Sequence, residues 1–391
     1  MAENLRSRSL NSQSLRWRRR RLKGQKVDSS SWPGLFPAIH FQHSIKNAGQ
    51  IMTVRIYTFD EALKRADERK HLLLGNGFSI ACKRDIFSYA SLFENADFKD
   101  RPHIPEIFER LGTRDFEEVM NLLRSLKKVI EVYVDNPVIT EAVTDDYEFL
   151  KESLVRIVAG RHPTHPFEIS DDAYRSCRKF LTNFKCIYSL NYDLLLYWAL
   201  MKDDIDKLGL TSDDGFRSPS GDEDASYVAW ESYHSASVMF MHGALHLFDA
   251  GHELRKYTWS RTKIALIDQI REALDKDLLP LFVSEGDITT KFRRITHNAY
   301  LHRCYQSFKG IGGSLFIYGH SLAENDNHIL KCIERRDSRI KSLHVSIYGD
   351  PKSALNQKII NRAEILASVR ADRRNPIAVE FFDAASAKIW G

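Results

Sequence analysis

Polar residues suited to ligand chemistry stand directly after four short apolar segments of this sequence. They form the groups Gly75-Asn76-Gly77-Phe78-Ser79, Asn191-Tyr192-Asp193, His242-Gly243 and Gly319-His320-Ser321. Two glycines two positions apart let a chain turn sharply and approach a phosphate, and a serine behind them can cap a helix or contact that phosphate. In open α/β sheets, ligands bind outside the carboxyl ends of the strands. The four groups therefore predict a nucleotide crevice.

Each group also has a plain structural interpretation. The glycine turn is compatible with an ordinary connection from strand to helix, Asn191 with an Asx turn, and His242 with a hydrogen-bonded core histidine. His162 and His165 could bind a metal, but the prolines around them favour a rigid loop. A site is favoured because four polar groups share one register, at the ends of successive predicted strands.

The elements that must position these groups alternate between strand and helix. Apolar segments predict strands at 72–74, 185–190, 237–241, 281–283, 314–318, 343–348 and 377–382. Apolar residues at helical spacing predict a helical insertion at about 100–160, after the strand at 72–74. Residues 203–226, rich in Gly, Ser and Asp, predict a mobile loop. The predicted class is α/β and Rossmann-like, with a mostly parallel sheet and helices on both faces.

The positive charge of the chain is concentrated at its beginning. Residues 1–51 hold ten basic and two acidic side chains, a net charge of +8, whereas the rest holds 47 basic and 50 acidic ones, a net charge of −3. Residues 1–51 are either a basic arm for nucleic acid or membranes, or a disordered leader upstream of a true start at Met52. We favour the leader, because a regular pattern begins only after Met52. The remaining 340 residues offer no overall basic bias for nucleic acid.

Cysteine usage and hydropathy bear on the compartment. The five cysteines are odd in number and too widely spaced for a CxxC metal motif, which favours reduced thiols in a cytoplasmic protein. No apolar run approaches the ~20 residues that a membrane helix needs. The N-terminus lacks the apolar core of a secretory signal peptide. We therefore expect a cytoplasmic protein without a membrane segment.

In order and content, the four groups resemble the motifs of sirtuin-type NAD-consuming domains. Those domains have a Gly-x-Gly-x-Ser turn, then Asn-x-Asp, then His-Gly, and the turn at Gly319 with Asn325 and Asp326 behind it is similar to their final nucleotide-binding turn. The resemblance runs from about residue 57 to residue 348. It is closest to the sirtuin-like domains of bacterial anti-phage defence systems, in a group that opens with LLLGNGFS. It implies that residues 52–391 form an NAD-binding domain.

The resemblance also implies a role for each matching residue. Asn191 would position the nicotinamide ribose or the attacking water, Asp193 would contact the nicotinamide amide, and His242 would be the general base. The nucleotide-binding residues implied by the two glycine turns are Gly75, Asn76, Gly77, Phe78, Ser79, Gly319, Ser321, Asn325 and Asp326. The first turn would hold the pyrophosphate and the neighbouring ribose, and the second turn would contact the adenosine half.

One departure from the family changes the expected reaction. Sirtuin deacylases carry a four-cysteine zinc module after the Asn-x-Asp motif, and this chain has no cysteine between Cys186 and Cys304. Without that module the acyl-lysine cleft is in doubt, so protein deacylation is disfavoured and water becomes the expected acceptor. We expect an NAD glycohydrolase with NAD as substrate and no metal, serving anti-phage defence as a homo-oligomer or with a defence-system partner. A non-catalytic sensor of NAD or an ADP-ribose derivative, and an ADP-ribosyl transferase, remain alternatives.

Overall fold

The structure is a computed structural model, and it describes most of the chain after residue 53. The described range is 54–391, without residues 134–135, 211, 220–221, 223, 252, 259–260, 262–263, 277, 279, 284–287 and 372–374. The predictions for residues 1–51 and for a start at Met52 concern residues outside this range. Within it, no helix combines the length and the apolarity that crossing a bilayer requires.

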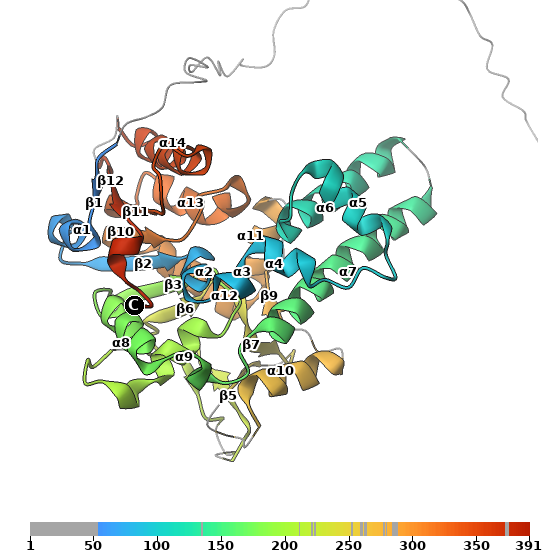
Figure 1. Cartoon of the computed structure of the whole chain (residues 1–391), viewed down its shortest axis with the longest axis horizontal. Coiled ribbons are helices and arrows are strands. Elements are labelled where there is room, and N and C mark those ends of the chain that lie inside the picture. The colour runs from blue at the N-terminus through green and yellow to red at the C-terminus, as the bar shows by residue number, and fades with distance from the viewer. Residues whose placement is uncertain are drawn as a thin grey trace, which may run out of the picture. The chain divides into compact units, whose positions relative to one another are not determined.

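A parallel sheet forms the centre of the described residues (Figure 1). Across the sheet, its seven strands are β1 (Ile56–Tyr57), β12 (Ala378–Asp383), β11 (Arg339–Ile347), β10 (Gly312–Tyr318), β2 (Lys70–Leu74), β3 (Cys186–Ser189) and β6 (Val238–Phe240). Every pairing between neighbours is parallel, which confirms the α/β, Rossmann-like class. The strand that we predicted as the first is second in the chain, because the two-residue β1 precedes it.

The path of the chain reverses at β2. From β2 it continues to β3 and β6 on one side, and it later returns to β10, β11 and β12 on the other side. The reversal lies between β2 and β10, which is the kind of point where open α/β sheets bind ligands. Residues 72–74 of β2 are fully buried, as expected for a central strand covered on both faces.

Helices cover both faces of this sheet. One face carries α1 (Phe59–Arg65), α8 (Asp171–Leu181) and α9 (Leu195–Met201), and the other carries α12 (Ala299–Lys309), α13 (Asn327–Glu334) and α14 (Ala354–Ser368). On the first face Phe59 packs against Phe180 and Phe316, with ring centroids 5.0 and 6.0 Å away. On the other face, the ring centroids of Tyr188 and Phe308 lie 5.0 Å apart. Aromatic packing thus holds both layers to the strands.

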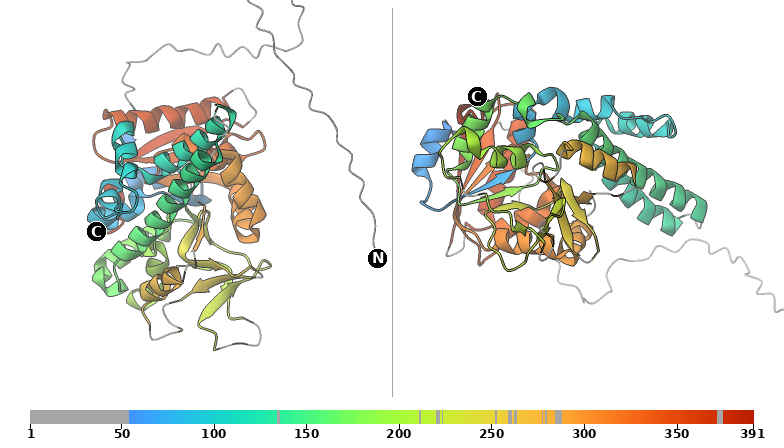
Figure 2. Two further views of the ribbon diagram at one scale, coloured as in Figure 1. Left: turned by 90° about the vertical axis from the view of Figure 1, so that its right-hand side faces the viewer. Right: turned by 90° about the horizontal axis from the view of Figure 1, so that it is seen from below.

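The helical insertion lies between β2 and β3. It comprises α2 (Gly77–Cys82), α3 (Arg84–Phe87), α4 (Tyr89–Glu94), α5 (His103–Leu111), α6 (Phe116–Tyr133) and α7 (Pro137–Arg161), and η1 (Pro166–Glu168) follows. Asn136 caps α7 by accepting from the backbone N–H of Val138, and Pro137 occupies the first turn. Both views of Figure 2 show α6 running alongside α7. The predicted helical region is thus confirmed as separate helices.

A second sheet was not predicted. Its antiparallel strands lie in the order β4 (Phe216–Arg217), β5 (Tyr227–Trp230), β8 (Leu254–Tyr257), β7 (Gly243–Asp249) and β9 (Pro280–Phe282). The prediction of a mobile loop at 203–226 was therefore wrong at β4, and the predicted strand at 281–283 belongs to this sheet rather than to the parallel one. Short strands between polar loops show little periodicity, which is why sequence reasoning missed them.

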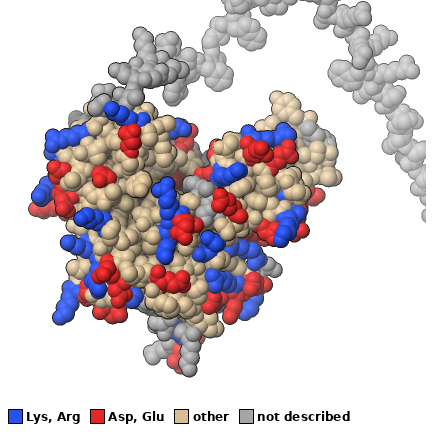
Figure 3. Space-filling view, in the orientation of Figure 1, with Lys and Arg blue, Asp and Glu red and all other residues tan. Residues whose placement is uncertain are grey.

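Helix α10 (Leu266–Asp275) lies between strands β8 and β9 of the second sheet, and α11 (Ile288–His297) and α12 lead from β9 back to β10 of the parallel sheet. Helix α10 packs against α7 and β7, and α11 packs against α12 and α13. On the face of the molecule shown in Figure 3, basic and acidic side chains are interspersed. This mixture agrees with the near balance of charge outside residues 1–51.

Candidate functional site

The predicted glycine turn and the Asn-x-Asp motif meet at the carboxyl ends of β2 and β3. Ser79 donates a hydrogen bond to Asp193 Oδ2, and Asn191 Nδ2 donates to Ser79 Oγ over 3.0 Å. We call Ser79, Asn191 and Asp193 the Asp193 cluster. All three side chains are buried. The structure therefore brings together residues that lie more than a hundred positions apart in sequence.

The Asp193 cluster leaves one buried polar atom without a partner. Asn191 Oδ1 is inaccessible to solvent, and no described residue donates a hydrogen bond to it. A buried acceptor in this condition costs about 1–3 kcal/mol, so such atoms usually meet a water or a ligand. The side-chain nitrogen of Asn191 already donates to Ser79 Oγ. The side-chain oxygen of Asn191 is therefore the atom that can accept from a ligand hydroxyl or a water.

Asp193 is held in place by several donors in an apolar setting. Its Oδ1 accepts from the backbone N–H of Leu195 over 2.9 Å at the start of α9. Burial raises the pKa of Asp193, and the bonds from Ser79 and Leu195 oppose that change. Nearby, His162 Nε2 accepts from the backbone N–H of Leu194 over 3.1 Å, and His162 Nδ1 lies 2.9 Å from the carbonyl of Pro163. His162 therefore supports the loop that carries Asp193, a role that the sequence did not predict.

The glycines of the two turns allow the turns to touch each other. The N–H of Gly77 donates to the carbonyl of Gly319 over 2.8 Å, and that of Gly75 donates to the carbonyl of Tyr318 over 2.9 Å. A Cβ on Gly77 would lie 2.5 Å from the Cα of Gly319, which is far too close. Gly319 itself has a φ of +67°. These glycines are thus required by backbone packing at the point where the sheet reverses, whatever ligand binds there.

His242 follows β6, next to the loop that carries Asn191. The N–H of Met241 donates to the carbonyl of Ser189 over 2.9 Å, and the rings of Tyr192 and His242 are stacked 6.4 Å apart. The glycine after His242 also has a structural reason: Gly243 has a φ of +84°, and a Cβ there would lie 1.9 Å from the carbonyl oxygen of Leu281. The His-Gly motif therefore marks the point where the chain leaves the parallel sheet for the antiparallel one.

His242 belongs to a second group of buried ionisable residues. Its Nε2 lies 3.0 Å from His328 Nε2 and 3.8 Å from Asp326 Oδ1. Asp326 also bonds to Lys291 Nζ at 3.2 Å and to His320 Nε2 at 2.8 Å. We call His242, Lys291, His320, Asp326 and His328 the Asp326 cluster. They come from the end of β6, from α11, and from the segment after β10 that contains η3 (Glu324–Asp326) and α13.

Burial and charge set the protonation of this cluster. Burial lowers the pKa of His242 well below its ordinary value; Asp326 opposes that change, and Lys291 adds to it. Burial lowers the pKa of His328 to about 4. For Asp326, burial acts to raise the pKa, but Lys291 and the hydrogen bond from His320 outweigh it and hold the pKa well below the usual range. At neutral pH, His242 is therefore a neutral imidazole beside a carboxylate.

The turn after β10 is shaped by His320. The backbone N–H of Leu322 donates to His320 Nδ1 over 3.0 Å, which leaves Nε2 as the nitrogen that carries the proton donated to Asp326. Leu322 has a φ of +56°, a left-handed conformation that is costly for a residue with a branched side chain. Burial of Leu322 and its bond to His320 hold the turn in this form.

Sequence reasoning placed some of these residues and missed others. Asp326 joins His242, although it was predicted as a nucleotide contact. His320 stands in one of the four predicted groups but was given no role, and Lys291 and His328 were missed. His328 lies two positions after Asp326, but a buried lysine on a polar helix gives no signal in the sequence.

The other predicted nucleotide contacts lie around the two turns without joining either cluster. Asn76 donates to the carbonyl of Phe87 over 3.2 Å, and Phe78 is fully buried against Trp390, with ring centroids 5.1 Å apart. Ser321 is exposed, and Asn325 is half-buried just before Asp326. Phe78 therefore has a packing role in this structure.

Three members of the Asp326 cluster are close enough together to bind a metal ion. Ligand atoms of His242, Asp326 and His328 lie within 4.8 Å of one another. The Lys291 ammonium is bonded to the same carboxylate, so an ion would compete with it for Asp326 Oδ1. We therefore interpret the group as an ion-paired network.

Comparison with known proteins finds one family. The model of the family described as a domain of unknown function (DUF4917) matches residues 72–390. The match begins inside β2 and takes in the insertion, the second sheet and all members of both clusters. No curated protein matches the chain.

Proposed function

This chain belongs to the DUF4917 family, and we propose that it is an NAD glycohydrolase whose reaction takes place between the Asp193 cluster and His242. The observation that carries the proposal is the buried, unpartnered Oδ1 of Asn191 at the carboxyl end of β3. A neutral His242 follows the neighbouring strand β6. The resemblance to sirtuin-type domains supplies the substrate class.

The proposed reaction is hydrolysis of the bond between nicotinamide and ribose. That bond breaks with its electron pair going to the nicotinamide nitrogen, so nicotinamide leaves as a neutral molecule and the ribose carbon becomes oxocarbenium-like. Water attacks this carbon and gives a proton to His242, whose lowered pKa leaves it neutral and able to accept. Asn191 Oδ1 would accept from the ribose hydroxyl or the water. The products are nicotinamide and ADP-ribose.

The burial of the site has a consequence for access. Asn191, Asp193 and His242 are each at most 7% exposed, so NAD reaches them only when the strand-end loops move apart. An enzyme that consumes NAD must be restrained in its own cell, and a closed site would provide that restraint. We expect the resting chain to hydrolyse NAD slowly.

The test is nicotinamide release by variants of the full chain. We expect Asn191→Ala and His242→Gln to lower the rate of release by about 10²–10⁴-fold, the usual contribution of a positioned acid or base. Each has a matched control. Asn183→Ala removes an amide that caps α8 away from the site, and His344→Gln removes another buried histidine, in β11. Chromatography separates nicotinamide, ADP-ribose and cyclic product.

The variants must be folded for this comparison to count. Urea unfolding identifies any variant that loses activity by losing its fold. Undiminished release by both Asn191→Ala and His242→Gln would overturn the proposal, and so would absence of NAD binding by the wild-type chain. Label transferred from NAD to protein would instead indicate ADP-ribosyl transfer.

One observation favours a non-catalytic sensor as the second candidate. His242 Nε2 is already engaged with His328 at 3.0 Å, so that nitrogen is not available to water in this arrangement. A sensor would bind NAD or an ADP-ribose derivative and release no nicotinamide. Calorimetric binding of NAD together with zero turnover would establish this alternative.

The biological setting that the resemblance implies remains a prediction. A defence effector would deplete cellular NAD on infection, in the cytoplasm, alone as a homo-oligomer or with a partner protein. Measuring NAD in infected cells that carry wild-type or His242→Gln protein tests this role. Equal NAD levels in both would contradict it.

A further inference from the structure

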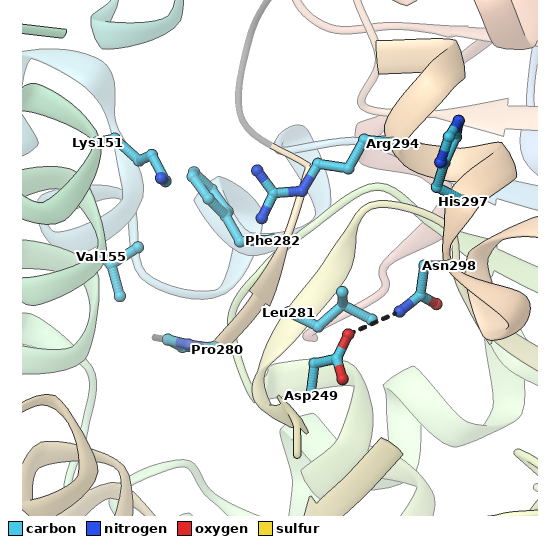
Figure 4. A pocket seen from close by; sticks show the side chains of 9 residues that line it. All are labelled: Lys151, Val155, Asp249, Pro280, Leu281, Phe282, Arg294, His297 and Asn298. Atoms are coloured by element: carbon cyan, nitrogen blue, oxygen red, sulfur yellow. Dashed lines mark hydrogen bonds between the residues drawn. The ribbon is translucent and has the colours of Figure 1, made fainter. Parts of the chain in front are cut away.

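A cavity of about 280 Å³ lies between the insertion and the second sheet, apart from both clusters. Helix α7 contributes Lys151 and Val155, strand β9 contributes residues 280–282, and α11 contributes Arg294. Figure 4 shows that Lys151 and Arg294 direct their cationic ends toward the Phe282 ring from opposite sides. Two cations that face the same space repel each other unless an anion lies between them.

The two cations differ in how far their charges are already compensated. Lys151 Nζ lies 2.7 Å from Glu148 Oε2, one turn earlier on α7, and that carboxylate is half exposed. Arg294 is exposed, and it makes no hydrogen bond or ion pair with any described residue. A guanidinium offers several N–H donors in a planar fork that matches phosphate oxygens. Arg294 is therefore the principal anion-binding group in this cavity.

A helix begins at the same cavity. Asn298 lines it and caps α12, its Oδ1 accepting from the backbone N–H of Leu301 over 3.1 Å. The first turn of this eleven-residue helix therefore lies beside Arg294, and its dipole adds to the attraction for an anion.

The acidic residue of the cavity wall is already bonded. Asp249 Oδ2 accepts from Asn298 Nδ2 over 3.3 Å, as Figure 4 shows, and Asp249 Oδ1 accepts from the backbone N–H of Gly251 over 2.9 Å. These bonds hold the carboxylate on the side of the cavity away from Lys151. Lys151 and Arg294 are therefore the two groups of the described lining that face this space with a positive charge.

We propose that this cavity binds a small ligand that carries a phosphate monoester, of nucleoside monophosphate size. The phosphate would lie between Arg294 and Lys151, and the apolar wall of Val155 and residues 280–282 would contact the remainder of the ligand. The volume lies just below the range of about 300–1,000 Å³ that is typical of small-molecule pockets, so a dinucleotide would not fit inside.

The bound ligand would contact a strand that also supports the strand-end loops. Phe282 packs on Tyr192 with ring centroids 4.5 Å apart, and the Tyr192 hydroxyl donates to the carbonyl of Val283 over 2.9 Å. The N–H of Val283 donates to the carbonyl of His242 over 2.8 Å. Cavity and catalytic loops thus share β9 and the residue that follows it.

The test is calorimetric titration of the full chain with AMP and, separately, with inorganic phosphate, in buffer free of other polyvalent anions. We expect saturable binding of AMP by the wild-type chain, weakened roughly tenfold or more by Arg294→Met, which keeps the aliphatic stem and removes the donors. The matched control is Arg293→Met, at the neighbouring exposed position of α11, which does not line the cavity. We expect this control to bind AMP like the wild type.

Each outcome decides the proposal. Binding of both probes, or of AMP alone, with selective loss in Arg294→Met supports it. No AMP binding by the wild-type chain, or equal losses in the Arg293 and Arg294 variants, overturns it. AMP binding that is lost in Ser79→Ala and kept in Arg294→Met would place AMP at the strand ends and also overturns it. Because binding is measured directly, the result does not depend on whether the chain hydrolyses NAD.

Discussion

The Asp193 and Asp326 clusters each bury an aspartate near the carboxyl ends of the parallel sheet, with opposite electrostatic results. Asp193 has only neutral donors around it, so burial raises its pKa. Asp326 lies against Lys291 and His320, so its pKa is held well below the usual range. The difference teaches that burial alone does not set protonation; the charge of the first neighbours decides it.

The two clusters also differ in how the charge of the aspartate is compensated. The charge of Asp326 is balanced within the chain by Lys291, which makes that cluster a bracing element between α11 and the segment after β10. The Asp193 cluster keeps Asn191 Oδ1 without a partner among the described residues. In the proposed reaction, the Asp193 cluster and His242 would contact the ligand, and the other members of the Asp326 cluster would orient His242.

The largest expected effect comes from breaking the ion pair of the Asp326 cluster. Lys291→Met leaves the Asp326 carboxylate buried without its ammonium partner, which should lower the free energy of unfolding by about 3–5 kcal/mol. Urea unfolding measures the loss. The control is Arg110→Met, which removes an exposed pair with Glu106 on α5 and should cost less than about 0.5 kcal/mol. Equal small losses would mean that the Asp326 cluster does not brace the fold.

A second substitution acts where the glycine turn before Ser79 contacts the glycine turn before His320. Gly77 lies two residues before Ser79, and it touches Gly319, which directly precedes His320. Gly77→Ala places a methyl group against the Gly319 backbone, so we expect a loss of about 1–3 kcal/mol in unfolding free energy, together with loss of nicotinamide release.

The same substitution at Gly160 provides the control for Gly77. Gly160 lies near the end of α7 with open space around it, so Gly160→Ala should be neutral or stabilising by up to about 1 kcal/mol. Denaturant unfolding of both variants makes the comparison. A Gly77→Ala chain as stable as wild type would show that the two turns do not need close contact.

The smallest expected effect is a difference between Asp193 and Asp206 in how each changes the pH dependence of the unfolding free energy. Because the folded pKa of Asp193 is raised above its ordinary value of 3.8, the ionised form of Asp193 lowers the stability at neutral pH, and this cost is relieved as the pH falls toward 3.8. The stability of wild type relative to Asp193→Asn should therefore increase on acidification from pH 7 to about 4. Unfolding curves at several pH values measure this difference.

Asp206 is the reference for a carboxylate whose pKa is lowered rather than raised. Its bond with Arg178 lowers its pKa, and it serves better than Asp326, because burial also lowers the pKa of the neighbouring His328, to about 4. The stability of wild type relative to Asp206→Asn should stay constant down to about pH 4 and then decrease. Curves of the same sign for Asp193→Asn and Asp206→Asn would contradict the contrast drawn between the clusters.

Local sequence patterns predicted the elements whose apolar residues form a continuous run or recur at helical spacing. The apolar run at 72–74 appears in the structure as β2, the glycines behind it as the turn at Gly75, and the helical spacing at about 100–160 as the helices of the insertion. A buried parallel strand must be apolar on both faces, and a long helix must repeat its apolar residues, so both leave traces in the sequence. In the second sheet only β9 left such a trace, as the apolar run at 281–283, and the sequence did not show which sheet it joins.

The sequence by itself determined the α/β class and the order of the strand-end groups, because these depend on neighbouring residues. Only the tertiary structure decided which groups meet. It showed that the glycines of two distant turns pack on each other, that Asn191 bonds to Ser79 and keeps an acceptor open, and that Lys291 is buried as the partner of Asp326. A lysine on a polar helix looks like a surface residue until a distant carboxylate folds against it, since burial of a charge depends on its partner in space.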